Sequence, residues 1–398
     1  MLLLLAYLLL TLPCLAQDHA AHKQDKTAPG VASLDVYATG DTVLHLLIAR
    51  RPAPAVPATL EYLRSTDAGQ TWSTPTPVVT NQPPSPIHRG QDAQIAAAGN
   101  NLIAAWTTAG TEDRFGRGPI ATAISHDAGR TWQPGPNPAD DGQSTGHAFL
   151  DLAADASGTF HLVWLDGRDP KSPGKGLRYA RSTDAGQTWS SNRTLDPATC
   201  ECCWNTIACT ADNRLAVLYR DRDPRDMSMV TSADLGKTWS ASTRVGAFDW
   251  NITACPHVGG ALAFAPDAHV AHAIVWNAKD ATVRGAYLLS SADNGRTWST
   301  PRQLGNDPKS WHTDLATGPN GQVAAVYDAY TEDGGAIFAT VSADQGRTWS
   351  PPQRLTTPEV SASHPRVVRT GNVFRVFWTQ SPTEGGPATW QSAHLLAK

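Results

Sequence analysis

The phrase STDAGQTW occupies Ser65–Trp72, and it returns five times along the chain with small changes. The other copies are SHDAGRTW at 125–132, STDAGQTW at 182–189, SADLGKTW at 232–239, SADNGRTW at 291–298 and SADQGRTW at 342–349. Successive copies stand 50 to 60 residues apart. A repeat of that period predicts one propeller or solenoid rather than a string of unrelated domains.

The residues of the phrase indicate a tight turn between two strands. Aspartate at the third position can accept hydrogen bonds from the backbone N–H groups that follow, and glycine at the fifth position supplies a positive φ. The tryptophan is expected to pack back over the turn. Between the phrases, alternating apolar runs separated by glycine turns indicate further strands. We interpret the phrase as a folding device at a hairpin and not as an active site.

The phrase resembles the Asp box, or BNR repeat, of the sialidase-type β-propellers. The resemblance runs from about residue 31 to the C-terminus and implies an all-β fold with Asp-box hairpins. Six units with a box and a last unit without one, residues 364–398, predict a seven-bladed β-propeller closed into a ring. Six blades, as in many sialidases, are the alternative. Because such propellers also serve as receptors and assembly factors, the resemblance implies architecture more than activity.

The start of the chain, MLLLLAYLLLTLPCLA, is typical of a secretory signal peptide over residues 1–16. Residues 17–30 are expected to form a flexible arm, and residues 31–398 a single propeller domain. We expect a periplasmic or extracellular protein with no membrane span after signal cleavage. The formal net charge of −4 gives no reason to expect nucleic acid as a partner.

Histidine and cysteine recur at one phase of the repeat. The first strand of each propeller blade lines the central channel, so residues that begin these strands are expected at the hub. A histidine or cysteine stands fourteen to sixteen residues after each of the six box tryptophans. The residues concerned are His88, His147, Cys203 with its neighbour Cys202, Cys255 with the nearby His257, His312 and His364.

Imidazole and thiolate groups converging on one axis are the ligands of a soft or borderline metal. We predict that the hub binds copper, with zinc as the alternative. Six blades supply more ligands than one tetrahedral ion needs, so more than one ion can be accommodated. The function predicted from this pattern is copper handling or a copper-dependent oxidoreductase activity.

Four of the six cysteines fall in ATCECCWNTIACT, residues 198–210. An oxidising compartment favours disulfides, so a purely structural role for the cysteines is the competing interpretation. Cys200 and Cys209 are predicted as the local bridge. Cys202 or Cys203 can also pair with Cys255 or with each other. Metal and disulfide can coexist, because one bridge leaves other thiols for a metal.

Arginines and aspartates alternate where second strands are expected to end, as in residues 164–170 and 218–226. These side chains can hold a small anionic or glycan ligand through bidentate contacts. They can equally neutralise one another as a rim of salt bridges, and the rim is the interpretation we favour. Arg220 and Asp221 are the candidate catalytic residues of this region.

Sialidase chemistry requires an arginine clamp, a Tyr–Glu pair and an acid/base aspartate. Arg50, Arg51 and Pro52 precede the first box without the Arg-Ile-Pro motif of that family, and Tyr330 with Glu332 is no recognisable match. We therefore do not predict sialidase activity. The alternative to the copper hypothesis is a sialidase-like glycoside hydrolase or glycan-binding propeller with structural disulfides, and a plain interaction scaffold comes third.

Overall fold

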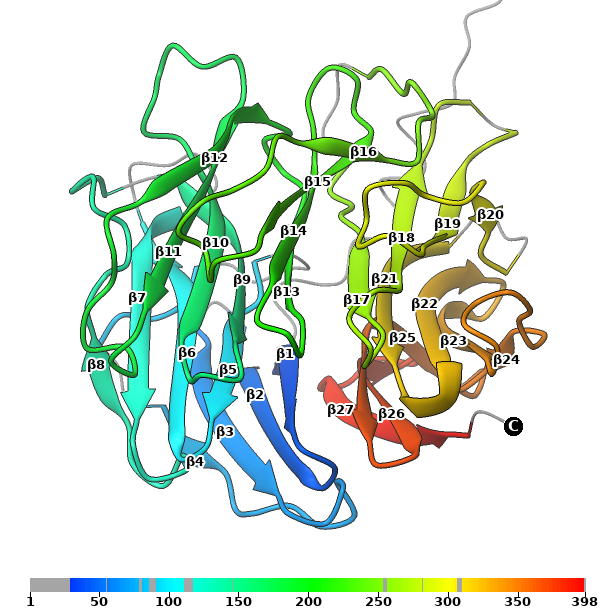
Figure 1. The fold of residues 1–398 in the computed structure, drawn as a ribbon. Helices are drawn as coiled ribbons and strands as arrows, with labels where there is room; N and C mark the ends of the chain where they lie inside the picture. Colours follow the sequence, from blue (N-terminus) through cyan, green and yellow to red (C-terminus); the bar gives the residue numbers. More distant parts are fainter. Residues whose placement is uncertain are drawn as a thin grey trace, which may run out of the picture.

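Seven antiparallel sheets stand around a common axis in the computed structural model (Figure 1). The structure describes residues 29–54, 56–78, 81–85, 91–110, 117–144, 146–252, 256–280, 282–305 and 310–396. Each sheet is a meander in chain order, with four strands in the first six blades and three in the last. The prediction of a seven-bladed propeller is confirmed over these residues, and the six-bladed alternative is excluded.

Blades 1 to 4 comprise the first sixteen strands. Blade 1 contains β1 (Gly30–Thr39), β2 (Val43–Arg51), β3 (Thr59–Ser65) and β4 (Thr76–Pro77). Blade 2 contains β5 (Gln94–Ala98), β6 (Asn101–Ala109), β7 (Arg117–Ser125) and β8 (Gln133–Gly135). Blade 3 contains β9 (His147–Ala154), β10 (Phe160–Asp166), β11 (Lys175–Ser182) and β12 (Arg193–Thr199). Blade 4 contains β13 (Thr206–Cys209), β14 (Leu215–Arg220), β15 (Met227–Ser232) and β16 (Thr243–Val245).

Blades 5 to 7 complete the ring. Blade 5 contains β17 (Ala261–Phe264), β18 (Ala271–Asn277), β19 (Gly285–Ser291) and β20 (Arg302–Gln303). Blade 6 contains β21 (Ser310–Thr317), β22 (Val323–Thr331), β23 (Gly334–Ser342) and β24 (Gln353–Arg354), with the short 3-10 helix η1 (Pro319–Gly321) between its first two strands. Blade 7 contains β25 (Val360–Thr370), β26 (Val373–Pro382) and β27 (Thr389–Leu395).

The first and last blades meet and close the ring. The innermost strand of each blade contacts that of the next blade, and β25 contacts β1. Gly30 also forms a parallel bridge with Ala388, whose carbonyl accepts a hydrogen bond from the Val31 amide at 2.8 Å. This closure leaves β1 without an exposed edge at its start, which is how propellers avoid unpaired strands.

The second strand of each blade is a continuous apolar run because neighbouring blades pack on both of its faces. Every residue of β10 and β18 is buried. A sheet that is covered on both faces by neighbouring blades buries both sets of alternating side chains, whereas a sheet covered on one face buries only one set. The core is therefore divided into clusters that lie between adjacent blades.

The Asp boxes lie at the turns between third and fourth strands, as predicted. In the first box the Thr71 amide and hydroxyl both donate to the carboxylate of Asp67, and the Gly69 amide donates to Ser65 Oγ. The same bonds recur at Asp127, Asp184, Asp234, Asp293 and Asp344. The bonds from Thr71 lower the pKa of Asp67 to about 2. Gly69 has a φ of 81°, which confirms the expected role of the box glycine.

The predicted packing of a box tryptophan over its own turn is seen at Trp349, whose Nε1 donates to the Gly346 carbonyl at 2.9 Å, and other box tryptophans also contact the preceding blade. The ring of Trp132 in blade 2 packs edge-on against Tyr62 of blade 1, with centroids 5.4 Å apart. Trp239 of blade 4 packs likewise against Tyr179 of blade 3 at 4.9 Å. These tryptophans contact the preceding blade because the neighbouring sheet supplies an aromatic surface there. The box therefore joins one blade to another as well as closing its own turn.

Aspartates on innermost strands connect consecutive blades near the axis. Asp35 of β1 accepts the Ile95 amide of β5 at 2.9 Å, and Asp314 of β21 accepts the Val367 amide of β25 at 2.9 Å. Asp151 of β9 accepts the Ile207 amide of β13 at 2.6 Å. These bonds satisfy backbone donors that no strand pairs at the axis, and so they fix the position of each inner strand relative to the next.

The predicted signal peptide and nearly all of the predicted arm lie outside the described residues. Among the residues that the structure does describe, no helix has the length and apolar character to cross a membrane.

Candidate functional site

The predicted ligands, which follow each box tryptophan by fourteen to sixteen residues, lie in or shortly before the inner strands. His147 opens β9, Cys203 lies three residues ahead of β13, and His312 and His364 lie within β21 and β25. His257 is exposed in the segment before β17. His88 and Cys255 fall outside the residues that the structure describes. The alignment of histidine and cysteine with the inner strands is therefore confirmed for the described positions.

The structure distributes these residues over three groups and not one ring. Within the described part of the chain, three sets of side chains have ligand atoms within 4.8 Å of one another. They are Cys200, Cys202 and Cys203; His312, Asp328 and His364; and Asp141, His147 and Asp166. The predicted ring of ligands, which left room for more than one ion, is divided into separate groups over the described residues, and the pair His312 and His364 spans blades 6 and 7. His257 belongs to none of the three groups.

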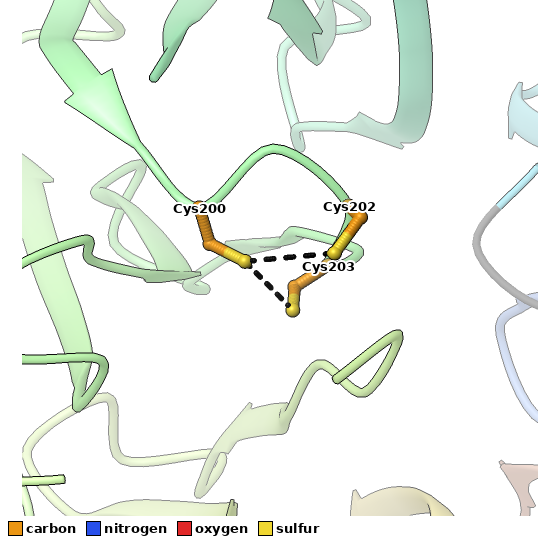
Figure 2. A group of neighbouring side chains, drawn as sticks. All are labelled: Cys200, Cys202 and Cys203. Atoms are coloured by element: carbon orange, nitrogen blue, oxygen red, sulfur yellow. Dashed lines mark hydrogen bonds between the residues drawn. The ribbon is translucent and has the colours of Figure 1, made fainter. Parts of the chain in front are cut away.

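The first group is a cluster of three sulfurs in the loop between β12 and β13 (Figure 2). Cys200 Sγ lies 3.1 Å from Cys203 Sγ and 3.8 Å from Cys202 Sγ. All three residues are buried, with at most 5% of their surface exposed. The Cys200 amide donates to the Arg220 carbonyl at the end of β14, which anchors the start of the loop.

Arginine stabilises negative charge on this cluster. Arg225 Nη1 lies 3.1 Å from Cys200 Sγ. Hydrogen bonds from Cys202 and Cys203, together with the nearby Arg220, hold the pKa of Cys200 well below its usual range. Burial raises the pKa of Cys203. The group is thus poised to carry a thiolate on Cys200 beside protonated neighbours, and a bound cation would favour the release of their protons.

The predicted Cys200–Cys209 disulfide is wrong. Neither cysteine is in a disulfide, and neither are Cys202 and Cys203. Cys200 bonds to Arg220 at one end of β14, while Cys209 pairs with Leu215 at the other end. Five residues of strand separate the two positions by roughly 17 Å, whereas a disulfide needs Cα atoms within about 7 Å. Cys200 instead completes a group with Cys202 and Cys203.

The second group joins two histidines from blades 6 and 7 through one carboxylate. Asp328, near the outer end of β22, is buried and accepts His312 Nδ1 at 2.7 Å, the His312 amide at 2.8 Å and the His364 amide at 2.9 Å. The two imidazole rings are stacked with centroids 4.1 Å apart. The nearby histidines hold the pKa of Asp328 well below its usual range despite burial.

β-Bulges direct these histidines toward the hub. In β21 the register with β22 shifts between Ser310 and Thr313, so Trp311 and His312 together oppose Asp328. In β25 the shift falls between Ser363 and Arg366, so His364 and Pro365 oppose one residue of β26. His364 has a φ of 58°, which is uncommon for a residue other than glycine. Bulges of this kind commonly re-aim side chains beside functional sites.

The third group is an ion-pair network at the start of β9. His147 Nε2 lies 3.2 Å from Asp141 Oδ2 and 3.6 Å from Asp166 Oδ2. Arg168 already donates to Asp166 at 2.8 Å and to Asp140 at 2.7 Å. Because the guanidinium neutralises these carboxylates, the group is better suited to holding the blade 3 loops together than to binding a cation.

The favoured rim of salt bridges is present, and Arg220 is not part of it. Arg222 pairs with Glu201 at 2.7 Å, and Arg244 with Asp249 at 2.7 Å. Arg220 is instead 1% exposed, and its three side-chain nitrogens donate to the carbonyls of Val258, Arg225 and Trp276. This corrects the candidate catalytic assignment of Arg220, because it is buried and each of its three side-chain nitrogens donates to a backbone carbonyl.

Asp221, the other candidate catalytic residue, has a local role. Its carboxylate accepts the Arg222 amide at 2.7 Å and the Ser228 hydroxyl at 3.2 Å. Burial raises its pKa. It lies in none of the three groups of the described residues. These contacts support the turn between β14 and β15.

Sequence reasoning missed several residues of the site. Asp328 stood in the second-strand segment 326–335 among other carboxylates, with no sign that it would face His312. Arg225 was assigned to the rim. Both could have been found only from the register of neighbouring strands, because their partners lie on another strand or loop.

Known proteins resemble this chain in its repeat and in its propeller fold. A family model described as the BNR repeat-like domain matches residues 158–384, more than half of the chain. The chain belongs to this BNR repeat family. No curated protein matches the sequence.

Solved structures resemble this BNR repeat protein in fold. A polysaccharide lyase of family PL25, an ulvan lyase bound to -[GlcA(1-4)Rha3S]-, has a TM-score of 0.60 at 9% identity, covering 89% of this chain and 92% of that chain. A protein of unknown function from Dyadobacter fermentans has a TM-score of 0.55 at 15% identity, covering 92% and 94%. The NanB sialidase of Streptococcus pneumoniae has a TM-score of 0.51 at 13% identity, covering 94% and 70%.

Proposed function

We propose that this BNR repeat propeller binds copper(I) through the thiolates of Cys200, Cys202 and Cys203. The observation that carries the proposal is the convergence of three buried sulfurs whose positions lie within 4.8 Å of one another. Thiolates are soft ligands and select copper(I) among the metals that a cell supplies. The cationic Arg225 at Cys200 favours the deprotonated form that a metal requires.

The sulfur geometry is close to that of a bound ion. Metal–sulfur bonds of about 2.3 Å place sulfur atoms about 3.8 Å apart in a tetrahedral site and about 4.0 Å apart in a trigonal one. The Cys200–Cys202 separation of 3.8 Å fits both arrangements. The Cys200–Cys203 separation of 3.1 Å would have to widen by somewhat less than 1 Å. A side-chain rotation about Cys203 supplies a movement of that size.

The number of sulfurs favours copper over zinc. Structural zinc takes four ligands in a tetrahedron, while the described group offers three thiols. Three thiolates suit trigonal copper(I), which tolerates the lower coordination number. Because the group is buried, it suits the holding and transfer of copper better than catalysis on a large substrate. We therefore favour copper handling, in the periplasm or outside the cell, over a copper-dependent oxidoreductase.

Anaerobic copper(I) titration of the full chain against a chromophoric chelator tests this function. We expect the reduced protein to bind one copper(I) at the thiol group and the variant C200S/C202S/C203S to lose it. The matched control is Cys209→Ser, which removes a thiol outside the group and should bind normally. The proposal fails if the reduced wild type takes up no copper, or if the triple variant binds as much as the wild type.

X-ray absorption of the loaded protein distinguishes the two metals. Copper bound by three sulfurs at about 2.2–2.3 Å is the expected result. A protein that prefers zinc in competition, with a fourth sulfur or nitrogen in the spectrum, would replace copper by the alternative metal.

A glycan ligand is the second candidate function. A small pocket lined by Ala32, Ser33, Leu34, Asp92, His364 and Thr379 has room for about one water molecule, so a sugar could place at most a single group there. The ulvan lyase that shares the fold is bound to an anionic oligosaccharide. Calorimetric titration with anionic oligosaccharides tests this idea. Binding that persists in Asp92→Ala and His364→Ala variants would exclude this pocket as the site.

A further inference from the structure

We propose that His312 and His364 form a second metal site, separate from the three cysteines, for a borderline divalent ion, of which copper(II) is the first choice. The site draws one imidazole from β21 and one from β25. It goes beyond the thiol site, because imidazole ligands suit copper(II) and zinc whereas thiolates suit copper(I). The inference does not depend on whether the thiol group binds copper.

Ligand atoms of His312, Asp328 and His364 lie within 4.8 Å of one another, and a carboxylate fixes the tautomer of His312. Because the two rings are stacked, they would have to turn for both to coordinate one ion. His312 Nδ1 faces the Asp328 carboxylate at 2.7 Å, and a carboxylate can only accept. Nδ1 therefore carries the proton, and in the neutral ring the lone pair resides on Nε2. A carboxylate that holds the non-coordinating nitrogen is the usual outer partner of a metal-bound histidine. His364 Nδ1 has the Ser363 hydroxyl as its partner at 2.8 Å.

Asp328 acts as the organising group of this pair. One of its oxygens accepts the His312 amide, and the other accepts His312 Nδ1 and the His364 amide. A single carboxylate therefore fixes the backbone of two blades and the ring of one histidine. We regard Asp328 as a positioning residue, because its lone pairs are used to hold the histidines.

Other buried histidines show what a structural histidine looks like in this fold. His45, His161 and His272 lie on second strands, and each bonds through Nδ1 to a hydroxyl of the adjacent third strand at 2.7–2.8 Å. None of the three belongs to a ligand group of the described residues. His312 and His364 differ, since they come from two blades, are stacked on each other and occupy bulges.

The backbone conformation of His364 supports a functional role for this residue. A positive φ in a residue with a side chain is disfavoured, and such conformations concentrate at functional sites. The bulge and the φ of 58° together bring the imidazole of His364 onto that of His312. A bulge with a positive φ also occurs at Phe149 in β9, so what distinguishes His364 is the imidazole that it stacks on His312.

The two sites are neighbours. Trp204 directly follows Cys203, and its ring centroid lies 5.7 Å from that of His312. The indole therefore stands between the end of the thiol loop and the histidine pair. The thiol group can then retain copper(I) and the histidine pair copper(II), on either side of the Trp204 indole.

Copper(II) titration followed by electron paramagnetic resonance tests the second site. The variant C200S/C202S/C203S provides a background without the clustered thiols. We expect it to bind one copper(II) whose spectrum shows coupling to nitrogen. Adding H312Q and H364Q should weaken the affinity at least tenfold and remove the nitrogen coupling. His269→Gln is the matched control, since His269 is exposed and remote from the pair in sequence.

Two results would overturn the proposal. One is a natively folded background variant that binds no copper(II). The other is equal binding, with unchanged spectra, after both histidines are replaced. If the triple variant does not fold, cobalt(II) added to the reduced wild type answers the question. Weak visible bands without sulfur charge transfer, lost in H312Q/H364Q, are then expected, and bands unaffected by these substitutions contradict the site.

The variant Asp328→Asn tests whether Asp328 positions the histidines for a metal or only supports the fold. Asparagine keeps the shape of the side chain, so the fold should persist. We expect copper(II) affinity to fall about 10- to 100-fold, as for outer partners of metal-bound histidines, while copper(I) binding by the thiols is unchanged. Failure of the thiol site and failure of the histidine site are thus measured separately.

Discussion

At the scale of single residues, Arg225 places a positive charge against the thiol group, beside Cys202, Cys203 and Arg220. Its guanidinium lies 3.1 Å from Cys200 Sγ, and the pKa of that thiol is held low. Replacement by methionine removes the positive charge and should raise the pKa of Cys200 toward its usual range. The pH dependence of alkylation in the metal-free protein measures this change.

Arg222→Met is the appropriate control for that experiment. Arg222 lies near the same loop and pairs with Glu201. Its loss should leave the reactivity of Cys200 nearly unchanged. Equal shifts in both variants would mean that general surface charge, and not the contact of Arg225, sets the thiol pKa.

The sequence could identify hub residues but not their partners. The fixed distance from each box tryptophan found His147, Cys203, His312 and His364, because one phase of a propeller repeat always reaches the axis. It could not show that Cys200 would turn toward Cys203 and away from Cys209. That choice depends on a loop held by the carbonyl of Arg220, a contact with no periodic signal.

At the scale of elements, the box turn fits tightly against the neighbouring blade. A Cβ at Gly129 would overlap the ring of Tyr62, and Gly129 has a φ of 84°. Gly129→Ala should therefore destabilise the protein by about 2–4 kcal/mol, from backbone strain and overpacking together. Chemical denaturation at pH 7 measures the loss.

Gly99→Ala separates the two causes. Gly99 has a similar φ of 62°, but nothing lies within 4 Å of the added Cβ. The expected loss is about 1 kcal/mol, which reflects backbone strain alone. If the two variants lost equal stability, the contact between box and neighbouring blade would carry no energetic weight.

The bulges explain why the strands could be predicted from the sequence while the contacts of His312 and His364 could not. Alternation in the sequence indicates strands, but a single added residue in β21 or β25 leaves the apolar pattern almost unchanged. That one residue decides whether His312 faces Asp328. The contact of box tryptophans with the preceding blade was likewise not predicted, because it depends on a second blade that a local phrase cannot describe.

At the scale of the whole molecule, Arg366 balances the carboxylates around the axis. It contacts Asp92 at 2.8 Å and Asp35 at 3.4 Å. Removing one partner of a fully buried pair costs about 3–5 kcal/mol. The Arg366 side chain is 16% exposed, so we expect Arg366→Met to lose about 2–3 kcal/mol. Urea denaturation tests this, and a loss below about 0.5 kcal/mol, typical of an exposed pair, would contradict it.

Asp151 gives the ring a pH dependence. Burial raises its pKa to about 7, although the Ile207 amide and Arg366 act in the opposite direction. The unfolded chain loses this proton near pH 4. The protonated carboxyl therefore contributes full stability below about pH 4, and this contribution is lost as the pH rises through 7.

Asp151→Asn removes that slope. Urea midpoints measured between pH 4 and pH 8 should fall less steeply for the variant than for the wild type. Parallel curves would show that Asp151 is ionised in the folded protein throughout this range.

The ring itself was predictable because its signal is repeated. Six copies of one phrase and a seventh unit without it specify seven blades, since each unit must bury its sheet against a neighbour. The closing contact between Gly30 and Ala388 carries no such signal, because it joins residues at opposite ends of the chain. Repetition thus determines the architecture, while the unique contacts determine the chemistry.

The bulges at the hub have an evolutionary consequence. A residue in a bulge can change identity while the ladder around it keeps its register, because the extra position is not paired. Selection can therefore exchange the groups at the axis without rebuilding the blades. One ring of positions is free to acquire new chemistry, and the rest of the sequence preserves the scaffold.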